Sequence, residues 1–122
     1  MTKTALIGLH DYVLKENVEA LAEIRGYYVK VIDTFEEMEA QAQAKDYDRY
    51  LMDANFGHSG SPDVTPSETI WNLPQVKERV ERGEAKFIAV SNGLKTIENA
   101  TEKGIPAEDT FWAIREYESF FD

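Results

Sequence analysis

Two spacings of apolar residues alternate along this chain of 122 residues. Short, nearly continuous apolar runs are typical of buried β-strands, and runs in which apolar residues recur every three or four positions are typical of amphipathic helices. The strand-like runs cover residues 5–10, 27–32, 47–53 and 87–91. Because helical segments separate these runs, the pattern predicts one α/β domain in which helices cover both faces of a parallel sheet.

The first two helical segments have recognisable ends. The first follows Asp11 and stops at Gly26. Its expected inner face carries Leu14, Val18, Leu21 and Ile24. The second opens at Thr34 and Glu37, which have the spacing of a capping box. Its expected inner face carries Phe35, Met38 and Ala42.

The helical segments of the second half are shorter. Thr65 and Glu68 again have capping-box spacing, with a proline between them at a position where its missing N–H does no harm. Pro74 is expected to bend or split this helix. The apolar face continues through Val76 and Val80 to Gly83, and a later helix carries Leu94, Ile97 and Thr101 inward before Gly104 closes it.

The C-terminal segment fits two patterns. Phe111, Ile114, Tyr117 and Phe121 have near-helical spacing, whereas residues 110–114 are also rich in β-favouring types. The turn at residues 104–106 and the preceding alternation favour a fifth strand over 110–114. Only residues 116–122 then remain for a last helix.

Composition limits the partners. Asp and Glu number 23 against 13 Lys and Arg, and the formal charge of −10 opposes binding to nucleic acid or to an anionic membrane. The chain has no Cys, which excludes disulfides and thiolate chemistry. No apolar stretch approaches the roughly 20 residues that a membrane span needs. We therefore expect an acidic cytoplasmic protein whose partners are basic proteins or cations.

Two acidic residues stand where predicted strands end. Asp53 closes the third strand and is followed by a loop-forming segment, and Asp11 directly follows the first strand. Ligands of an open parallel sheet bind at the carboxyl ends of its strands. Two carboxylates at neighbouring strand ends form an anionic pocket suited to one hard divalent cation.

Further residues extend this pattern at later strand ends. Asn55 lies two positions after Asp53, Ser91 ends the fourth strand, and Trp112-Ala113-Ile114-Arg115 falls in the expected fifth strand. In this order the residues resemble those of a response-regulator receiver domain, the chemotaxis-regulator-like phosphoacceptor module of two-component signalling. The resemblance covers essentially residues 1–122 as a single domain. It implies a flavodoxin-like three-layer α/β/α sandwich with strand order 2-1-3-4-5, here with a short or missing last helix.

The resemblance also implies roles. Asp53 would be the phosphoacceptor of a histidine kinase or phosphotransfer protein, with Mg²⁺ held by Asp11, Asp53 and the backbone carbonyl of Asn55. Ser91 and Arg115 would bind the phosphoryl group, and Ser91 and Trp112 would act as the switch. The output would be contact with a downstream protein. Such a phosphoprotein carries out a transient self-phosphorylation and is not a metabolic enzyme.

The chain departs from the family pattern at several positions. His10 replaces the first acid of the metal pair, so Mg²⁺ affinity should fall. Arg115 replaces a lysine, and Glu116 replaces the proline that usually follows it. Arginine keeps the positive charge but presents it as a planar fork. The loop after Asp53 is longer than usual, which makes this an atypical receiver.

Simpler and competing interpretations remain open. Asp11 suits a helix N-cap, Ser91 a turn, Trp112 the packed interior and Arg115 the surface. His10 and His58 could join the two aspartates in a transition-metal site. At the level of function, the alternatives are a pseudo-receiver that binds proteins without phosphorylation and a small phosphohydrolase with Asp53 as its nucleophile.

Overall fold

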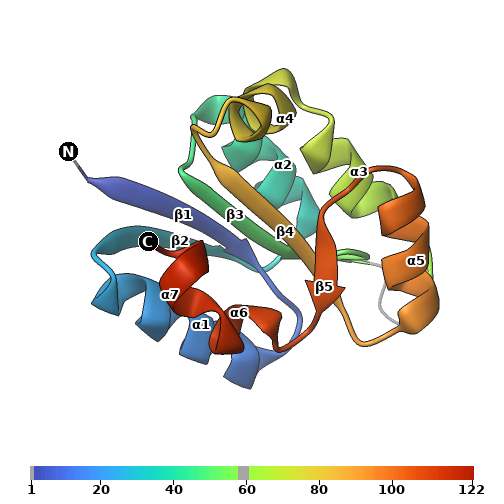
Figure 1. Cartoon of the computed structure of the whole chain (residues 1–122), viewed down its shortest axis with the longest axis horizontal. Coiled ribbons are helices and arrows are strands. Elements are labelled where there is room, and N and C mark those ends of the chain that lie inside the picture. The colour runs from blue at the N-terminus through green and yellow to red at the C-terminus, as the bar shows by residue number, and fades with distance from the viewer. Residues whose placement is uncertain (1, 58–60) are drawn as a thin grey trace.

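A five-stranded sheet forms the centre of the molecule (Figure 1). The structure is a computed structural model and describes residues 2–57 and 61–122. The strands are β1 (Lys3–Gly8), β2 (Tyr27–Ile32), β3 (Arg49–Asp53), β4 (Lys86–Ser91) and β5 (Ala107–Asp109). All paired strands are parallel, in the order β2-β1-β3-β4-β5. The flavodoxin-like order is thus confirmed.

Helices connect the strands as crossovers. They are α1 (Tyr12–Ile24), α2 (Phe35–Ala44), α3 (Thr65–Trp71), α4 (Pro74–Glu81), α5 (Leu94–Glu102), α6 (Trp112–Arg115) and α7 (Tyr117–Phe120). The helices α6 and α7 have four residues each, so the C-terminal helical segment is short, as expected. None of the helices in residues 2–57 and 61–122 is long and apolar enough to cross a membrane.

The sheet has a separate hydrophobic core on each face. Successive strand residues point to opposite faces, so Leu6 and Met52 join the core under α2, α3, α4 and α5. Ala5 and Leu51 join the core under α1, α6 and α7. These two cores make the three layers visible in Figure 1.

The register aligns the carboxyl ends of the central strands. Gly8 of β1 lies opposite Met52 of β3, and Asp53 lies opposite Val90 of β4. The chain continues from β1 to β2 on one side and from β3 to β4 on the other, so the strand order reverses between β1 and β3. This topological switch point is where doubly wound sheets bind ligands.

Several predicted helix ends are confirmed. The Asp11 carboxylate accepts from the Leu14 N–H at 2.9 Å and caps α1. The Thr34 hydroxyl accepts from the Glu37 N–H at 3.2 Å and caps α2. Pro74 opens α4 after α3 has ended, so it splits the predicted helix as expected.

Other helix predictions were wrong in detail. Ile24 is 73% exposed, because the inner face of α1 follows the four-residue spacing of Leu14, Val18 and Ala22. In α5 the buried residues are Thr96 and Ala100, and Leu94 and Thr101 are exposed. The N-cap of α3 is Val64, not Thr65, and it has no side-chain cap. The Asp63 carboxylate instead accepts from the Thr65 N–H at 3.0 Å.

The predicted fifth strand was placed too late in the chain. β5 pairs with β4 only from Ala107 to Asp109, and residues 112–115 form α6. The Asp109 carboxylate accepts from the Phe111 N–H at 3.0 Å, a local bond that turns the chain out of the sheet. The β-favouring residues that follow therefore pack as a helical turn against α1.

Candidate functional site

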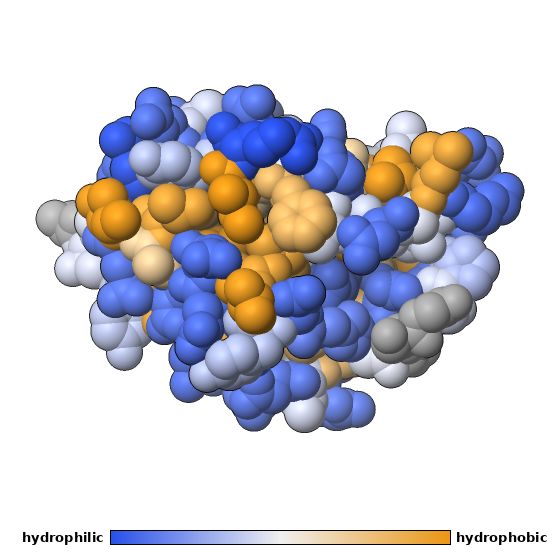
Figure 2. All heavy atoms as spheres, turned by 90° about the horizontal axis from the view of Figure 1, so that it is seen from below, coloured by the Kyte–Doolittle hydropathy of each residue, from blue (hydrophilic) through white to orange (hydrophobic). Residues whose placement is uncertain are grey.

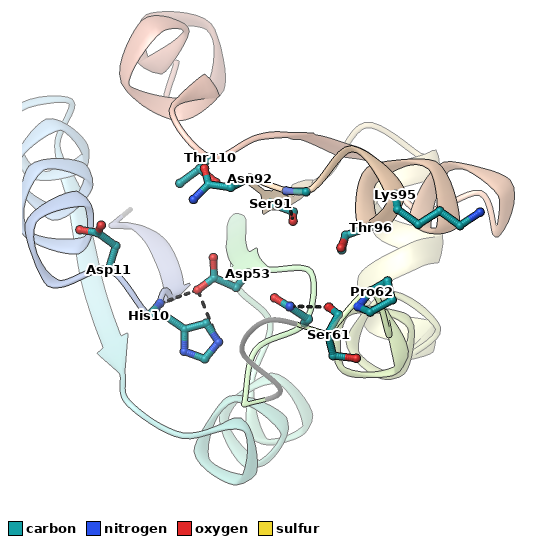
Figure 3. A pocket seen from close by; sticks show the side chains of 12 residues that line it. His10, Asp11, Asp53, Ser61, Pro62, Ser91, Asn92, Lys95, Thr96 and Thr110 are labelled. Carbon is teal, nitrogen blue, oxygen red and sulfur yellow. Dashed lines mark hydrogen bonds and ion pairs between the residues drawn. The ribbon is translucent and has the colours of Figure 1, made fainter.

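A pocket of about 540 Å³ opens at the carboxyl ends of the strands (Figure 3). Its wall combines two carboxylates with several hydroxyl and amide groups. The lining residues are His10, Asp11, Asp53, Asn55, Ser61, Pro62, Ser91, Asn92, Gly93, Lys95, Thr96 and Thr110. The structure therefore brings together four of the predicted site residues, Asp11, Asp53, Asn55 and Ser91.

Asp53 lies at the floor of this pocket and is only 9% exposed. The backbone N–H of His10 donates to its Oδ2 atom, and the two backbones are held together by the pairing of β1 with β3. Figure 3 shows the other carboxylate oxygen directed toward the side of the pocket that carries Ser91 and Thr110. One oxygen is thus held by the protein, and the other faces the open space.

The surroundings of Asp53 disfavour its charged form. Burial raises the pKa of this carboxyl group above its ordinary value, and the nearby Asp11 carboxylate raises it further. The hydrogen bond from the His10 N–H acts in the opposite direction because it stabilises the carboxylate. An opposite charge or hydrogen-bond donor entering the pocket would therefore relieve an unfavourable burial.

His10 ties the end of β1 to the loop after β3. Its ring packs against Phe56 with centroids 5.1 Å apart, and its Nε2 atom accepts from the Gly57 N–H at 3.2 Å. Nε2 lies 3.9 Å from Oδ2 of Asp53, beyond hydrogen-bonding distance.

Asp11, Asn55 and Ser91 each have a local structural partner. Asp11 caps α1 through Oδ1. The Asn55 side-chain amide donates to the Ser61 carbonyl at 2.7 Å. The Ser91 hydroxyl oxygen accepts from the Gly93 N–H at 3.0 Å. The capping and turn interpretations are thus confirmed, and they hold these residues at the pocket wall.

Arg115 and Trp112 do not reach the pocket. Arg115 is 55% exposed in its side chain and forms a two-pronged ion pair with Asp109, at 2.6 and 3.1 Å. Trp112 packs edge-on against Phe120 in the core beside α1. Both positions follow from the early end of β5, which places these residues on α6. The expected placement of Arg115 beside the phosphoacceptor was therefore wrong.

The sequence interpretation missed Thr96, Thr110 and Lys95. Thr110 follows the true end of β5, so a correct strand boundary would have identified it. Thr96 and Lys95 lie in the first turn of α5, just after the strand-end residue Ser91. In Figure 3 the Lys95 ammonium extends away from Asp53.

The residues that the structure describes contain no group of three or more imidazole and carboxylate side chains placed to hold a metal ion. His58, one member of the alternative transition-metal site, lies outside those residues. The carboxylates of Asp11 and Asp53 are among the oxygen ligands that line the pocket.

The fold and pocket define a doubly wound α/β protein with an acidic crevice at its strand ends. No protein-family model matches the chain, and no curated protein is similar to it in sequence. Among solved structures, the solution NMR structure of a de novo designed Rossmann 2x3 fold protein is similar, with a TM-score of 0.59 and 16% identity. The match covers 98% of this chain and 90% of the designed one. At this identity the likeness concerns the fold alone.

Proposed function

We propose that this protein is an atypical stand-alone receiver, a signalling switch in which Asp53 accepts a phosphoryl group. The observation that carries the proposal is the position of the Asp53 carboxylate. It lies at the floor of a pocket, with Oδ2 bound by the His10 N–H and the other oxygen facing the cavity. A carboxylate held in this way is oriented for nucleophilic attack.

In the proposed step, Oδ1 of Asp53 attacks the phosphorus of a phosphohistidine on a kinase or phosphotransfer protein. A new O–P bond forms and the P–N bond breaks, and its electron pair stays on the imidazole nitrogen of the donor. Ser91 supports the product because its oxygen already accepts from Gly93, which leaves its hydroxyl proton for a phosphoryl oxygen. Water later attacks the acyl phosphate and restores the carboxylate with release of phosphate.

Mg²⁺ is the proposed cofactor. Asp11, Asp53 and the Asn55 carbonyl would hold it, and the oxygen donor set fits a small hard cation that keeps several waters. Burial and, to a smaller extent, repulsion from Asp11 raise the pKa of Asp53, and a cation bound between the two carboxylates would relieve this unfavourable charge. When bound, the ion would offset the charge of the incoming phosphoryl group.

Intact mass spectrometry tests the proposal. The full chain is incubated with Mg²⁺ and a small phosphodonor such as phosphoramidate, and a gain of one phosphoryl group is expected. Asp53→Asn should abolish the gain, whereas Asp33→Asn, at an exposed aspartate after β2, should leave it unchanged. Wild-type protein that never gains this mass would contradict the proposal.

A constitutive protein-binding module is the second candidate. Two observations favour it: Arg115 is held by Asp109 outside the pocket, and apolar side chains are exposed near the pocket. Tyr12, Val13 and Phe111 are the exposed residues concerned, and Figure 2 shows apolar groups among charged ones on the side of α1, α6 and α7. Unchanged mass would favour this function. Steady phosphate release over many turnovers would instead indicate a phosphohydrolase.

For either of the first two functions, the output is a protein contact in the cytoplasm. The charge of −10 disfavours nucleic acid and anionic membrane as partners.

A further inference from the structure

The amino end of α5 opens into the pocket beside Ser91. The N-cap is Gly93, and no side chain caps the helix. The first helical hydrogen bond runs from the Ile97 N–H to the Gly93 carbonyl, at 3.1 Å. The N–H groups of residues 94–96 therefore have no acceptor within the described part of the chain. Such groups carry a partial positive charge and favour an anion.

Thr96 is an independent sign of a ligand at this place. The residue is only 5% exposed and lines the pocket, yet its hydroxyl has no hydrogen-bond partner among the described residues. Figure 3 shows this hydroxyl directed into the cavity on the side opposite His10. The hydroxyl faces the open pocket and is not committed to a protein partner, so it can donate to a polar ligand there.

Gly93 keeps the space between the two hydroxyl groups open. A Cβ atom at this position would lie 3.1 Å from Thr96 Oγ1 and 3.6 Å from Ser91 Oγ. The Ser91 oxygen accepts from the Gly93 N–H, so its proton is available to a ligand. The two hydroxyls and the α5 amides form a set of donors around one small space, here called the α5 cradle.

We propose that the α5 cradle binds a tetrahedral phosphoryl group through the hydroxyls of Ser91 and Thr96 and the N–H groups of residues 94–96. The bound group belongs either to a phosphodonor before transfer or to free phosphate after hydrolysis. This part of the inference rests on the proposed function. The cradle supplies donors that Arg115 does not, because Arg115 is paired with Asp109 outside the pocket.

The Asp53 and Asp11 carboxylates share the pocket and oppose an anion. Free phosphate should therefore bind the wild-type protein weakly. Asp53→Asn removes one of these negative charges and should strengthen phosphate binding several-fold. This dependence is a specific consequence of placing the anion in the same pocket as Asp53.

Titration of the ¹⁵N-labelled full chain with inorganic phosphate, followed by amide NMR spectra, tests the cradle. Progressive shifts of the residue 93–96 amides are expected, and Thr96→Val should weaken binding about tenfold, since one charge-assisted hydrogen bond is lost. Thr96→Ser should restore it. Thr101→Val is the matched control, because the Thr101 hydroxyl donates to the Ile97 carbonyl at 2.8 Å on an exposed turn.

The same spectra report whether each variant is folded. Absence of shifts at residues 93–96 in both wild type and Asp53→Asn would overturn the cradle, as would equal binding by wild type and Thr96→Val. Phosphate binding at residues 93–96 without phosphorylation of Asp53 would support the α5 cradle and contradict the phosphoacceptor function. Equal phosphorylation rates of wild type and Thr96→Val would remove the cradle from the transfer step.

Discussion

At the scale of single residues, Asp53 combines burial with a carboxylate that is only partly satisfied. Burial and the Asp11 charge disfavour its ionised form, and one backbone N–H from His10 supports it. Protein function is often accompanied by such local instability, because a group that suits a reaction is not the group that best stabilises the fold.

Asp53→Asn should therefore stabilise the protein at neutral pH. The folded pKa of Asp53 is raised above the unfolded value of about 3.9, so wild-type stability declines as pH rises through the folded pKa. The variant lacks this decline. Its advantage should be largest near pH 7 and should shrink as pH falls toward the unfolded pKa, where the wild-type carboxyl group is protonated in both states.

Urea denaturation of the two proteins across this pH range measures the difference. Asp33→Asn, at an exposed aspartate, should stay within about 0.5 kcal/mol of the wild type at pH 7. A variant at position 53 that is less stable than the wild type at neutral pH would show that the charge is stabilised, not penalised, in the fold.

At the scale of elements, the cap of α1 and the acidic pocket share one residue. Asp11 satisfies the Leu14 N–H and also contributes negative charge beside Asp53. These two roles have different chemical requirements. A neutral amide oxygen can cap a helix, but it adds no charge to a cation site.

Two substitutions at position 11 separate the roles. Asp11→Ala should lower the free energy of unfolding by about 1 kcal/mol because the cap is lost, whereas Asp11→Asn should stay close to wild type. Both should weaken Mg²⁺ binding, measured by calorimetric titration. Undiminished Mg²⁺ affinity in both variants would place the ion elsewhere.

The elements also show how far the sequence alone was informative. Strands β3 and β4 could be placed because nearly continuous apolar runs mark strands buried on both faces. β5 was misplaced because three partly exposed residues at the sheet edge leave no periodic signal. That error moved Arg115 into the predicted site. Thr96 was missed because a threonine within a helix gives no sign that its hydroxyl lacks a partner.

At the scale of the whole molecule, the two ends of the sheet hold different groups of charged residues. The carboxyl ends hold the acidic pocket, and the amino ends hold basic side chains that bind the C-terminal residues 119–122. The basic residues are Lys3, Arg25, Arg49 and Lys86. Lys86 and Arg49 donate to the Asp122 carboxylate and hold its pKa below the ordinary value. This network fixes α7 although the helix is only four residues long.

Arg49 is the central member of this network. It donates to the Phe120 carbonyl at 2.5 Å and to the Asp122 carboxylate at 2.7 Å, and its side chain is largely buried. Arg49→Met should destabilise the protein by about 1–3 kcal/mol, as measured by thermal or urea unfolding. Arg82→Met removes an exposed pair with Glu84 and should change stability by less than about 0.5 kcal/mol. Equal effects of the two substitutions would contradict this assignment.

The central claim is that a carboxylate oxygen of Asp53 forms the bond to phosphorus. An acyl phosphate is reduced by borohydride to an alcohol, so treating the phosphorylated protein with borohydride would convert the modified aspartate to homoserine. Peptide sequencing by mass spectrometry should then find homoserine at position 53 and aspartate at positions 11 and 33. Homoserine at another position, or none after incubation with phosphodonor and Mg²⁺, would contradict the proposed function.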